Sequence, residues 1–405
     1  MIEAFKEFFW MLVNVFADKP EPKADFLAVF SPDARPWISI LLSITPILLV
    51  FPLLFGITTI LERKGLGRMQ NRLGPNRVGP FGFAQFVADG LKMLTKEDIV
   101  PRAADRVVHF LAPLVLLIPV LFAFSVLPYG RNMVPIDIDG GLLFFFAVGS
   151  ATELSVFMAG WSSRNKYSLL GAMRGIAQMI SYELPLVLAS LTVVMMVGSL
   201  SLTQIVNAQS SQILGFLHTW HVFTPWGFAG FLLFLVAATA ESNRTPFDIP
   251  EAESEIIAGY LVEYSGFKYA LFFLGEYLGL FAVSAMGITL FLGGWLPPFA
   301  FLGSMPSWPW FFLKLLVMIF FFIWIRGTLP RLRTDQLMAF AWKFMLPMTL
   351  INIVVAGLWR FSREWQVPLA VGVRWVVCAA ILIAAYYIFG RAMQPRLAKR
   401  VYRYA

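Results

Sequence analysis

The chain has 405 residues, of which 59% are hydrophobic and only 14% are charged, and its net charge is +8. Soluble domains carry about 25% charged residues, so a soluble fold of this size is excluded. The basic residues lie in short loops between apolar runs, which argues against nucleic-acid binding. The single cysteine, Cys378, excludes an internal disulfide, a Cys-ligated iron–sulfur cluster and a thiolate zinc site on this chain alone.

The chain begins with an extension, residues 1–36, that precedes the first long apolar run. Apolar residues recur at helical spacing from Ile2 to Phe16, which predicts a short helix in the membrane interface. Charged residues interrupt this stretch and no small-residue cleavage site follows, so a cleavable signal peptide is not expected.

Runs of about 20 apolar residues, the length that crosses a bilayer, then recur along the chain. They predict an all-α polytopic membrane protein with about nine transmembrane helices. The predicted spans are 38–61, 107–128, 141–161, 169–200, 225–241, 266–292, 308–326, 337–358 and 370–390. Eight of them form a core at 37–358, and residues 359–405 add an extra C-terminal span with a basic tail.

Charge bias predicts the orientation of these spans. One set of alternate loops carries 22 of the 32 Lys and Arg residues and the other set carries eight. Cytoplasmic loops are the basic ones, so we expect the N-terminus outside and the C-terminus in the cytoplasm.

The first cytoplasmic loop, residues 62–106, is rich in arginine and contains a predicted surface helix. Apolar residues from Phe83 to Leu94 alternate at helical spacing with charged ones, including Asp89. Such a helix beside basic residues could line a portal for an amphipathic lipid. A plain membrane anchor explains the same pattern equally well.

Four acidic residues lie within or at the ends of different apolar spans: Glu153, Glu183, Glu241 and Glu276. A carboxylate in hydrocarbon costs several kcal/mol, so these side chains should face the protein interior or a wet cavity. Such groups suit a proton relay. The alternative is that each lies at a helix end or pairs with a basic residue.

The loop 241–264 is acidic on the face where the other predicted loops are basic. Asp248, Glu251, Glu253, Glu255 and Glu263 oppose a single arginine, Arg244. If the segment is helical, Glu251 and Glu255 share a face and repel, so a proton is readily accepted there. The pattern favours a proton entry or a basic partner.

His218 and His221 form an H-x-x-H pair in a loop flanked by Trp220 and Trp226. No third ligand lies nearby in the sequence, so an interfacial loop is a better interpretation than a metal pair. No G-x-G-x-x-G or P-loop motif occurs, and a nucleotide site is not expected on this chain.

Three stretches resemble one known family. The first runs from Glu62-Arg63-Lys64 through Gly74-Pro75-Asn76 to Ala88-Asp89-Gly90, the second from Arg244-Thr245-Pro246-Phe247-Asp248 through Glu255 to Glu263-Tyr264, and the third from Arg326 to Pro347. They are similar to the quinone-site membrane subunit of proton-pumping NADH:quinone oxidoreductase, respiratory complex I, which is the H subunit in bacteria. The resemblance spans roughly residues 38–358.

The resemblance implies a subunit that forms the quinone-access chamber and couples quinone reduction to proton translocation through buried acids. The quinone-binding residues it implies are Arg63, Arg72, Asp89, Arg244, Asp248 and Tyr277. The acids it implies for the proton path are Glu183, Glu241, Glu251, Glu253, Glu255 and Glu276. Glu153 falls about one turn from the acidic position of the family.

The resemblance also implies the surroundings of the chain. Quinone is the substrate, flavin and iron–sulfur clusters lie on partner subunits, and no cofactor or metal is bound by this chain. The partners are peripheral quinone-site subunits and antiporter-like membrane subunits, together with lipid, and the location is the bacterial inner membrane. The choice between ubiquinone and menaquinone is not expected to follow from this chain.

Two other classes compete with this interpretation. One is an energy-converting hydrogenase complex with a homologous membrane subunit that binds no quinone, against which the full Gly-Pro-Asn and Asp89 motif argues. The other is an independent ion transporter. The lack of an internal repeat and the elaborate loops argue against that class.

Overall fold

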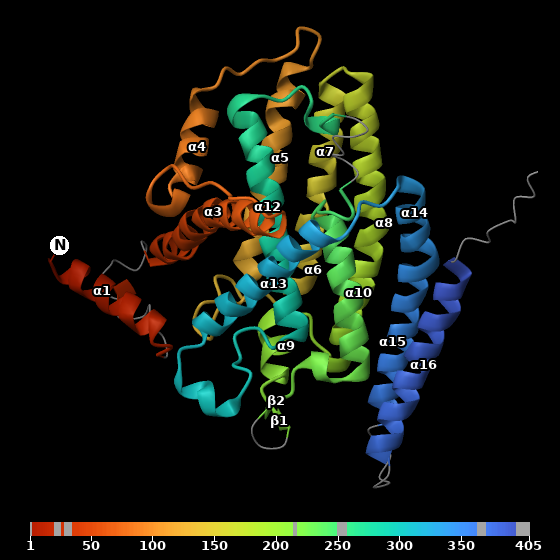
Figure 1. Cartoon of the computed structure of the whole chain (residues 1–405). Coiled ribbons are helices and arrows are strands. Elements are labelled where there is room, and N and C mark those ends of the chain that lie inside the picture. The colour runs from red at the N-terminus through yellow and green to blue at the C-terminus, as the bar shows by residue number, and fades with distance from the viewer. Residues whose placement is uncertain are drawn as a thin grey trace, which may run out of the picture.

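The computed structural model describes residues 2–19, 26–27, 35–213, 217–248, 257–362 and 370–393, and these form a bundle of long helices (Figure 1). The helices and single turns, in chain order, are α1 (Ile2–Phe16), α3 (Arg35–Met69), η1 (Pro80–Gly82), α4 (Gln85–Thr95), α5 (Arg106–Ala123), η2 (Phe124–Val126), α6 (Gly141–Gly149), α7 (Ala151–Ser162), α8 (Lys166–Val197), α9 (Leu202–Ala208), η3 (His221–Phe223), α10 (Pro225–Glu241), η4 (Gly259–Leu261), α12 (Gly266–Phe291), η5 (Ala300–Ser304), α13 (Trp308–Thr328), α14 (Thr334–Phe340), η6 (Ala341–Met345), α15 (Leu346–Phe361) and α16 (Ala370–Met393). A two-residue antiparallel pairing, β1 (Gln212–Ile213) with β2 (Leu217–His218), lies between α9 and η3.

The predicted all-α polytopic architecture is confirmed. Within the described ranges, eight helices are long and apolar enough to cross a membrane. The remaining predicted span, 225–241, is α10, which is equally apolar but has 17 residues, the lower end of the length needed. The predicted span 141–161 consists of α6 and α7, which meet at Ser150.

α12 is the central helix of the bundle. In its most apolar 18 residues 72% are buried, against 17% in α3 and 11% in α16. It packs against α3, α5, α10 and α13 (Figure 1). Lipid tails are as apolar as this core, so van der Waals contact between closely fitted helices stabilises the arrangement.

α3 and α13 run obliquely across the more upright α5, α8 and α10 (Figure 1). α3 continues to Met69, beyond the predicted end of the first span at 61. The helix leaves the apolar layer without breaking. Its last two turns therefore contain a charged segment that begins at Glu62. The helix is therefore longer than the predicted apolar span, and Glu62 is a helical residue packed inside the protein.

Both predicted amphipathic helices are present. α4 has no buried residue, and Val87, Leu91 and Leu94 are exposed on its apolar side. α1 ends against the start of α13, where the Phe16 and Trp308 rings make an edge contact at 5.4 Å. α1 is thus attached to the start of α13, while its interfacial position in a membrane stays a prediction.

Gly171 of α8 allows the turn η4 to lie directly against that helix. A Cβ atom at this position would fall 2.6 Å from the Cα atom of Gly259 and 3.0 Å from the backbone nitrogen of Tyr260. A small residue is required for so close an approach of two backbones. The contact fixes the position of Tyr260, which is buried next to α8.

The loop that follows β2 contains the His221 ring, which lies 5.2 Å from the Trp226 ring. Burial lowers the pKa of the His221 imidazole to about 4. In the unfolded chain this imidazole binds a proton near pH 6.5, whereas in the folded chain it stays neutral until about pH 4. The stability that the neutral, buried His221 contributes is therefore fully present above pH 6.5 and is lost as the pH falls toward 4. His218, by contrast, lies beside the Ser210 carbonyl, with 3.1 Å between Nδ1 and that oxygen.

We therefore expect His221→Phe to make the protein less sensitive to acid. Between pH 7 and pH 5 the free energy of unfolding of the wild type should fall by up to about 2 kcal/mol more than that of the variant. Thermal unfolding of the purified protein over this pH range measures the difference. Equal pH dependence of the two proteins would contradict the expectation.

Candidate functional site

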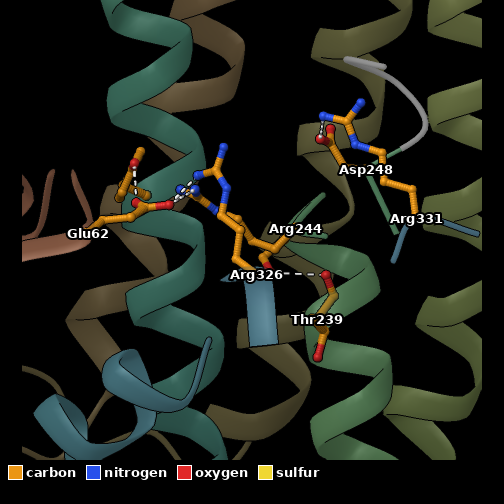
Figure 2. Close-up of polar contacts among 8 residues, drawn as sticks. Glu62, Thr239, Arg244, Asp248, Arg326 and Arg331 are labelled. Atoms are coloured by element: carbon orange, nitrogen blue, oxygen red, sulfur yellow. Dashed lines mark hydrogen bonds and ion pairs between the residues drawn. The ribbon is translucent and has the colours of Figure 1, made fainter. Parts of the chain in front are cut away.

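Glu62 is the centre of a buried cluster of charges made by four elements (Figure 2). Its Oε2 accepts a hydrogen bond of 2.5 Å from the Tyr277 hydroxyl of α12. Its Oε1 lies 3.3 Å from Nη1 of Arg244 and also pairs with Nη1 of Arg326, at the end of α13. Only 6% of the Glu62 side chain is exposed, so this carboxylate depends on its partners for stabilisation.

Arg244 is held in this cluster by contacts on two sides. Its guanidinium carbon lies 4.0 Å from the centre of the Tyr277 ring, and its backbone nitrogen donates to the Thr239 carbonyl at 3.2 Å (Figure 2). Burial alone would lower the pKa of the guanidinium, but Tyr277 and Glu62 outweigh it and hold that pKa above its ordinary value. Arg244 therefore carries a fixed positive charge.

The segment after α10 is positioned by a single amide of α8. Nε2 of Gln178 donates to the carbonyl oxygens of Ala240 and Phe247 at 2.8 and 2.7 Å, and to Oδ1 of Asn243 at 3.2 Å. The Pro246 carbonyl accepts a hydrogen bond from the Leu332 backbone at 3.1 Å. These contacts bring the second and third sequence motifs together.

A polar cavity of about 240 Å³ opens beside the cluster. Asp248 lies on its wall and pairs with Arg331, with 3.2 Å between Oδ2 and Nη2 (Figure 2). Arg244 and Arg326 line it as well. With three guanidinium groups on its wall, the cavity suits a polar, electron-rich headgroup.

A second cavity, of about 80 Å³, lies deeper in the bundle and is mostly apolar. Three of the acids predicted from the sequence, Glu183, Glu241 and Glu276, are on its wall. They come from α8, α10 and α12, so helices far apart in the sequence place their carboxyl groups around one space.

The two cavities share Asn243 and Glu276 as wall residues. Oε1 of Glu276 accepts a hydrogen bond of 2.6 Å from the Tyr260 hydroxyl, and Tyr260 lines the deeper cavity. Glu276 thus lies on the walls of both cavities: the polar one, which is lined by three arginines (the basic cavity), and the deeper one, which is lined by the acids (the acidic cavity).

Glu153 of α7 reaches the same region from outside the deeper cavity. Its side chain lies close to that of Glu183, although Glu153 itself does not line the cavity. Glu241 lies close enough to both to feel their charge.

The first motif forms a separate polar contact at the surface. Nη1 of Arg63 pairs with Oδ2 of Asp89 on α4 at 2.5 Å, and Gln85 donates to Oδ1 of Asp89 at 3.0 Å. The pair joins α3 to the amphipathic helix α4. Arg72 lies apart from this pair and donates to Gln70 at 2.7 Å.

Comparison with known proteins shows the family to which the chain belongs. The family model for NADH dehydrogenase matches residues 42–357. The NADH-quinone oxidoreductase H subunit of Dehalococcoides mccartyi is 50% identical over 318 residues, which are 77% of this chain and 86% of that protein. The H subunits of the same enzyme from Geobacillus kaustophilus and from an Acidovorax species are 52% and 45% identical, over 73% and 79% of this chain and 86% and 90% of their own lengths.

The chain belongs to the NADH dehydrogenase family of H subunits. It is therefore a membrane subunit of an oxidoreductase complex, as the sequence motifs indicated. The matched region ends before α16 and begins after α1, so both terminal helices lie outside it.

The structure brings together several of the site residues that were predicted from the sequence, and it separates others. Arg244 and Tyr277 share one cluster, Asp248 shares a cavity wall with Arg244, and Arg63 contacts Asp89. Arg72 contacts none of the other predicted residues in the described chain. Glu251, Glu253 and Glu255 lie outside the described residues.

Glu62, Arg326 and Gln178 are site residues that the sequence interpretation did not select. Glu62 and Arg326 were both seen as parts of motifs, but Glu62 was placed in a loop directly after a span and Arg326 at the last position of one, because hydropathy ends the apolar spans there. An acid directly after an apolar span was the available signal for Glu62. Gln178 gave no signal in the sequence, because a lone amide in a helix is most often structural.

In the described residues, no three His, Cys, Asp or Glu side chains cluster to hold a metal.

Proposed function

We propose that this chain forms the chamber through which quinone reaches its reduction site in NADH-quinone oxidoreductase. We further propose that the buried acids couple that reduction to proton translocation. The observation that supports this most strongly is that the basic cavity at Arg244 and the acidic cavity at Glu183 share the wall residue Glu276. A change of charge in one cavity is therefore felt in the other.

Reduction of a quinone to a quinol consumes two electrons and two protons. In this proposal the electrons come from flavin and iron–sulfur clusters on partner subunits, and this chain binds no cofactor of its own. Arg244, Asp248 and Tyr277 contact or face the quinone path, with Arg63, Asp89 and Arg72 at its membrane entrance. As negative charge appears and is neutralised, Glu276, Glu241 and Glu183 exchange protons in turn.

Glu251, Glu253 and Glu255 are proposed to connect the two cavities with the surface. Their motif follows Asp248 directly in the sequence, and Asp248 lines the basic cavity. We propose that the complex lies in the bacterial inner membrane with the N-terminus outside, because 22 of the 32 basic residues fall in one set of loops. The division into residues 1–36, 37–358 and 359–405 remains part of the proposal.

Glu276→Gln tests the coupling. Glutamine keeps the shape and still accepts from Tyr260, but it cannot release a proton, so quinone reduction and proton pumping should fall together by about fivefold or more. The assembled complex in liposomes gives both rates, with NADH oxidation by an artificial acceptor as the measure of an intact peripheral arm. Glu7→Gln on α1 is the matched control.

Unchanged pumping in the Glu276→Gln complex would contradict the coupling role. The wider assignment is tested by the activity of the purified wild-type complex, which should be inhibitor-sensitive NADH:quinone reduction. Copurification with a nickel hydrogenase activity, or ion transport by the isolated chain, would instead support one of the two competing classes.

A further inference from the structure

The C-terminal end of α12 is capped by side chains from two other helices. Nε2 of Gln209, which is fully buried, donates to the Thr289 and Leu290 carbonyl oxygens at 3.0 and 3.3 Å. Nζ of Lys314 on α13 donates to the carbonyl oxygens of Leu292, Gly294 and Leu296 at 2.6, 2.8 and 2.7 Å. The last carbonyl groups of a helix have no partners within it, so Gln209 satisfies two of them, while Lys314 binds carbonyl groups of the turn that follows the helix.

Lys314 brings a positive charge to this cap. Three carbonyl oxygens lie within hydrogen-bond distance of Nζ, an arrangement that favours the ammonium form with its three donors. The face of the Trp220 ring covers it, with the ring centre 4.1 Å from Nζ. A cation at the end of a helix also complements the negative end of the helix dipole.

A tightly packed apolar layer separates this cap from the acids. Glu276 and Phe291 are fifteen residues apart on α12, or about 22 Å along the helix axis. The deeper cavity reaches Val283. Beyond it the α12 side chains Met286, Ile288 and Phe291 have no exposed surface.

The polar side chains in this layer offer little support for a chain of water molecules. Ser284 and Thr289 donate to carbonyl oxygens of their own helix at 2.6 and 2.8 Å. Asn352 of α15 is fully buried, and neither its amide nitrogen nor its oxygen has a partner among the described residues. One amide can hold a water molecule but cannot by itself form a continuous path.

We propose that Lys314, together with Gln209 and Trp220, closes the end of the bundle opposite the basic cavity against protons. The packed layer removes the water that would carry a proton, and the fixed ammonium charge repels a proton that approaches from that end. The acids then exchange protons only with the basic cavity or sideways with neighbouring subunits. This inference rests on the proposed function for its purpose, but the seal itself can be measured without turnover.

The experiment measures passive proton leak through the assembled complex. Wild-type and Lys314→Met complexes are reconstituted into liposomes with an entrapped pH-sensitive dye, and a pH gradient is imposed without NADH or quinone. Methionine is unbranched and only one atom shorter than lysine, and it removes the charge and the donors. We expect the gradient to decay about fivefold faster with the variant. Lys314→Arg, which keeps the charge, should stay within about twofold of the wild type.

Lys166→Met is the matched control, because Lys166 is exposed and lies outside the cap. A purely structural role for Lys314 predicts a lower melting temperature and a lower quinone reductase rate without a leak. A Lys314→Met complex that decays at the wild-type rate would overturn the seal. If Lys314→Met does not assemble, Trp220→Leu is the second test, and it should at least double the rate at which the pH gradient decays. A decay at the wild-type rate in that variant would also overturn the proposal.

The outcome is independent of the coupling role of the acids. A leak in Lys314→Met with unchanged pumping in Glu276→Gln would support the seal and contradict the proposed coupling. The reverse pair of results would contradict the seal alone.

Discussion

Glu62→Gln should lower quinone-dependent NADH oxidation at least about tenfold and destabilise the protein by about 3–5 kcal/mol. Glutamine leaves Arg244, with 10% of its side chain exposed, and Arg326 facing each other without the carboxylate between them. Leaving a buried charge without its partner destabilises a protein by more than the intact pair stabilises it. Glutamine also keeps only one oxygen, so it cannot serve the arginines and the Tyr277 hydroxyl with separate acceptors as Glu62 does.

Assembly, melting temperature and quinone reductase rate of the purified complex check this expectation. Asp335→Asn is the control, since Asp335 faces Arg333 at 4.0 Å with both side chains at least 80% exposed. An exposed pair of this kind contributes about 1 kcal/mol or less. In Glu62→Gln/Arg326→Gln one of the two unpaired cations is removed, so part of the lost stability should return.

A Glu62→Gln complex with wild-type stability and rate would show that the cluster does not organise the chamber. A stable complex with a lost rate would place the role of Glu62 in quinone reduction itself. The two measurements therefore separate positioning from folding.

Glu241→Gln should reduce proton pumping and quinone reduction at least about tenfold. Glu241 lies on the wall of the deeper cavity, and its buried Oε2 has no partner among the described residues. Such an oxygen is free to take up a proton, and the neighbouring Glu183 and Glu153 make uptake responsive to their own charge. An amide in this place blocks the exchange.

The comparison variant for this test is Glu153→Gln. Glu153 does not line the cavity, so its carboxyl group is not on the proposed path, and a loss of only about twofold is expected. Both rates are measured in the same liposomes. Equal losses in the two variants would contradict the separate roles given to Glu241 and Glu153.

The family motifs did not reveal which charges meet in space. The pairs Arg63–Asp89 and Asp248–Arg331 join residues 26 and 83 positions apart in the sequence. Hydropathy also ended the first span one residue before Glu62, because a charged residue closes an apolar run even where the helix continues. The helix does continue, since α12 and α13 supply partners for that charge.

By itself, the sequence determined that the protein is a bundle of membrane helices with acids inside it. Lipid excludes unpaired backbone groups, so each long apolar run has to be a helix, and composition alone reveals this. The sequence also determined the family, through loop motifs long enough to be specific. Only the tertiary structure decided which acids share a cavity and that Glu62 binds two arginines. Those facts depend on how helices distant in the chain pack, and no periodicity along the chain records that packing.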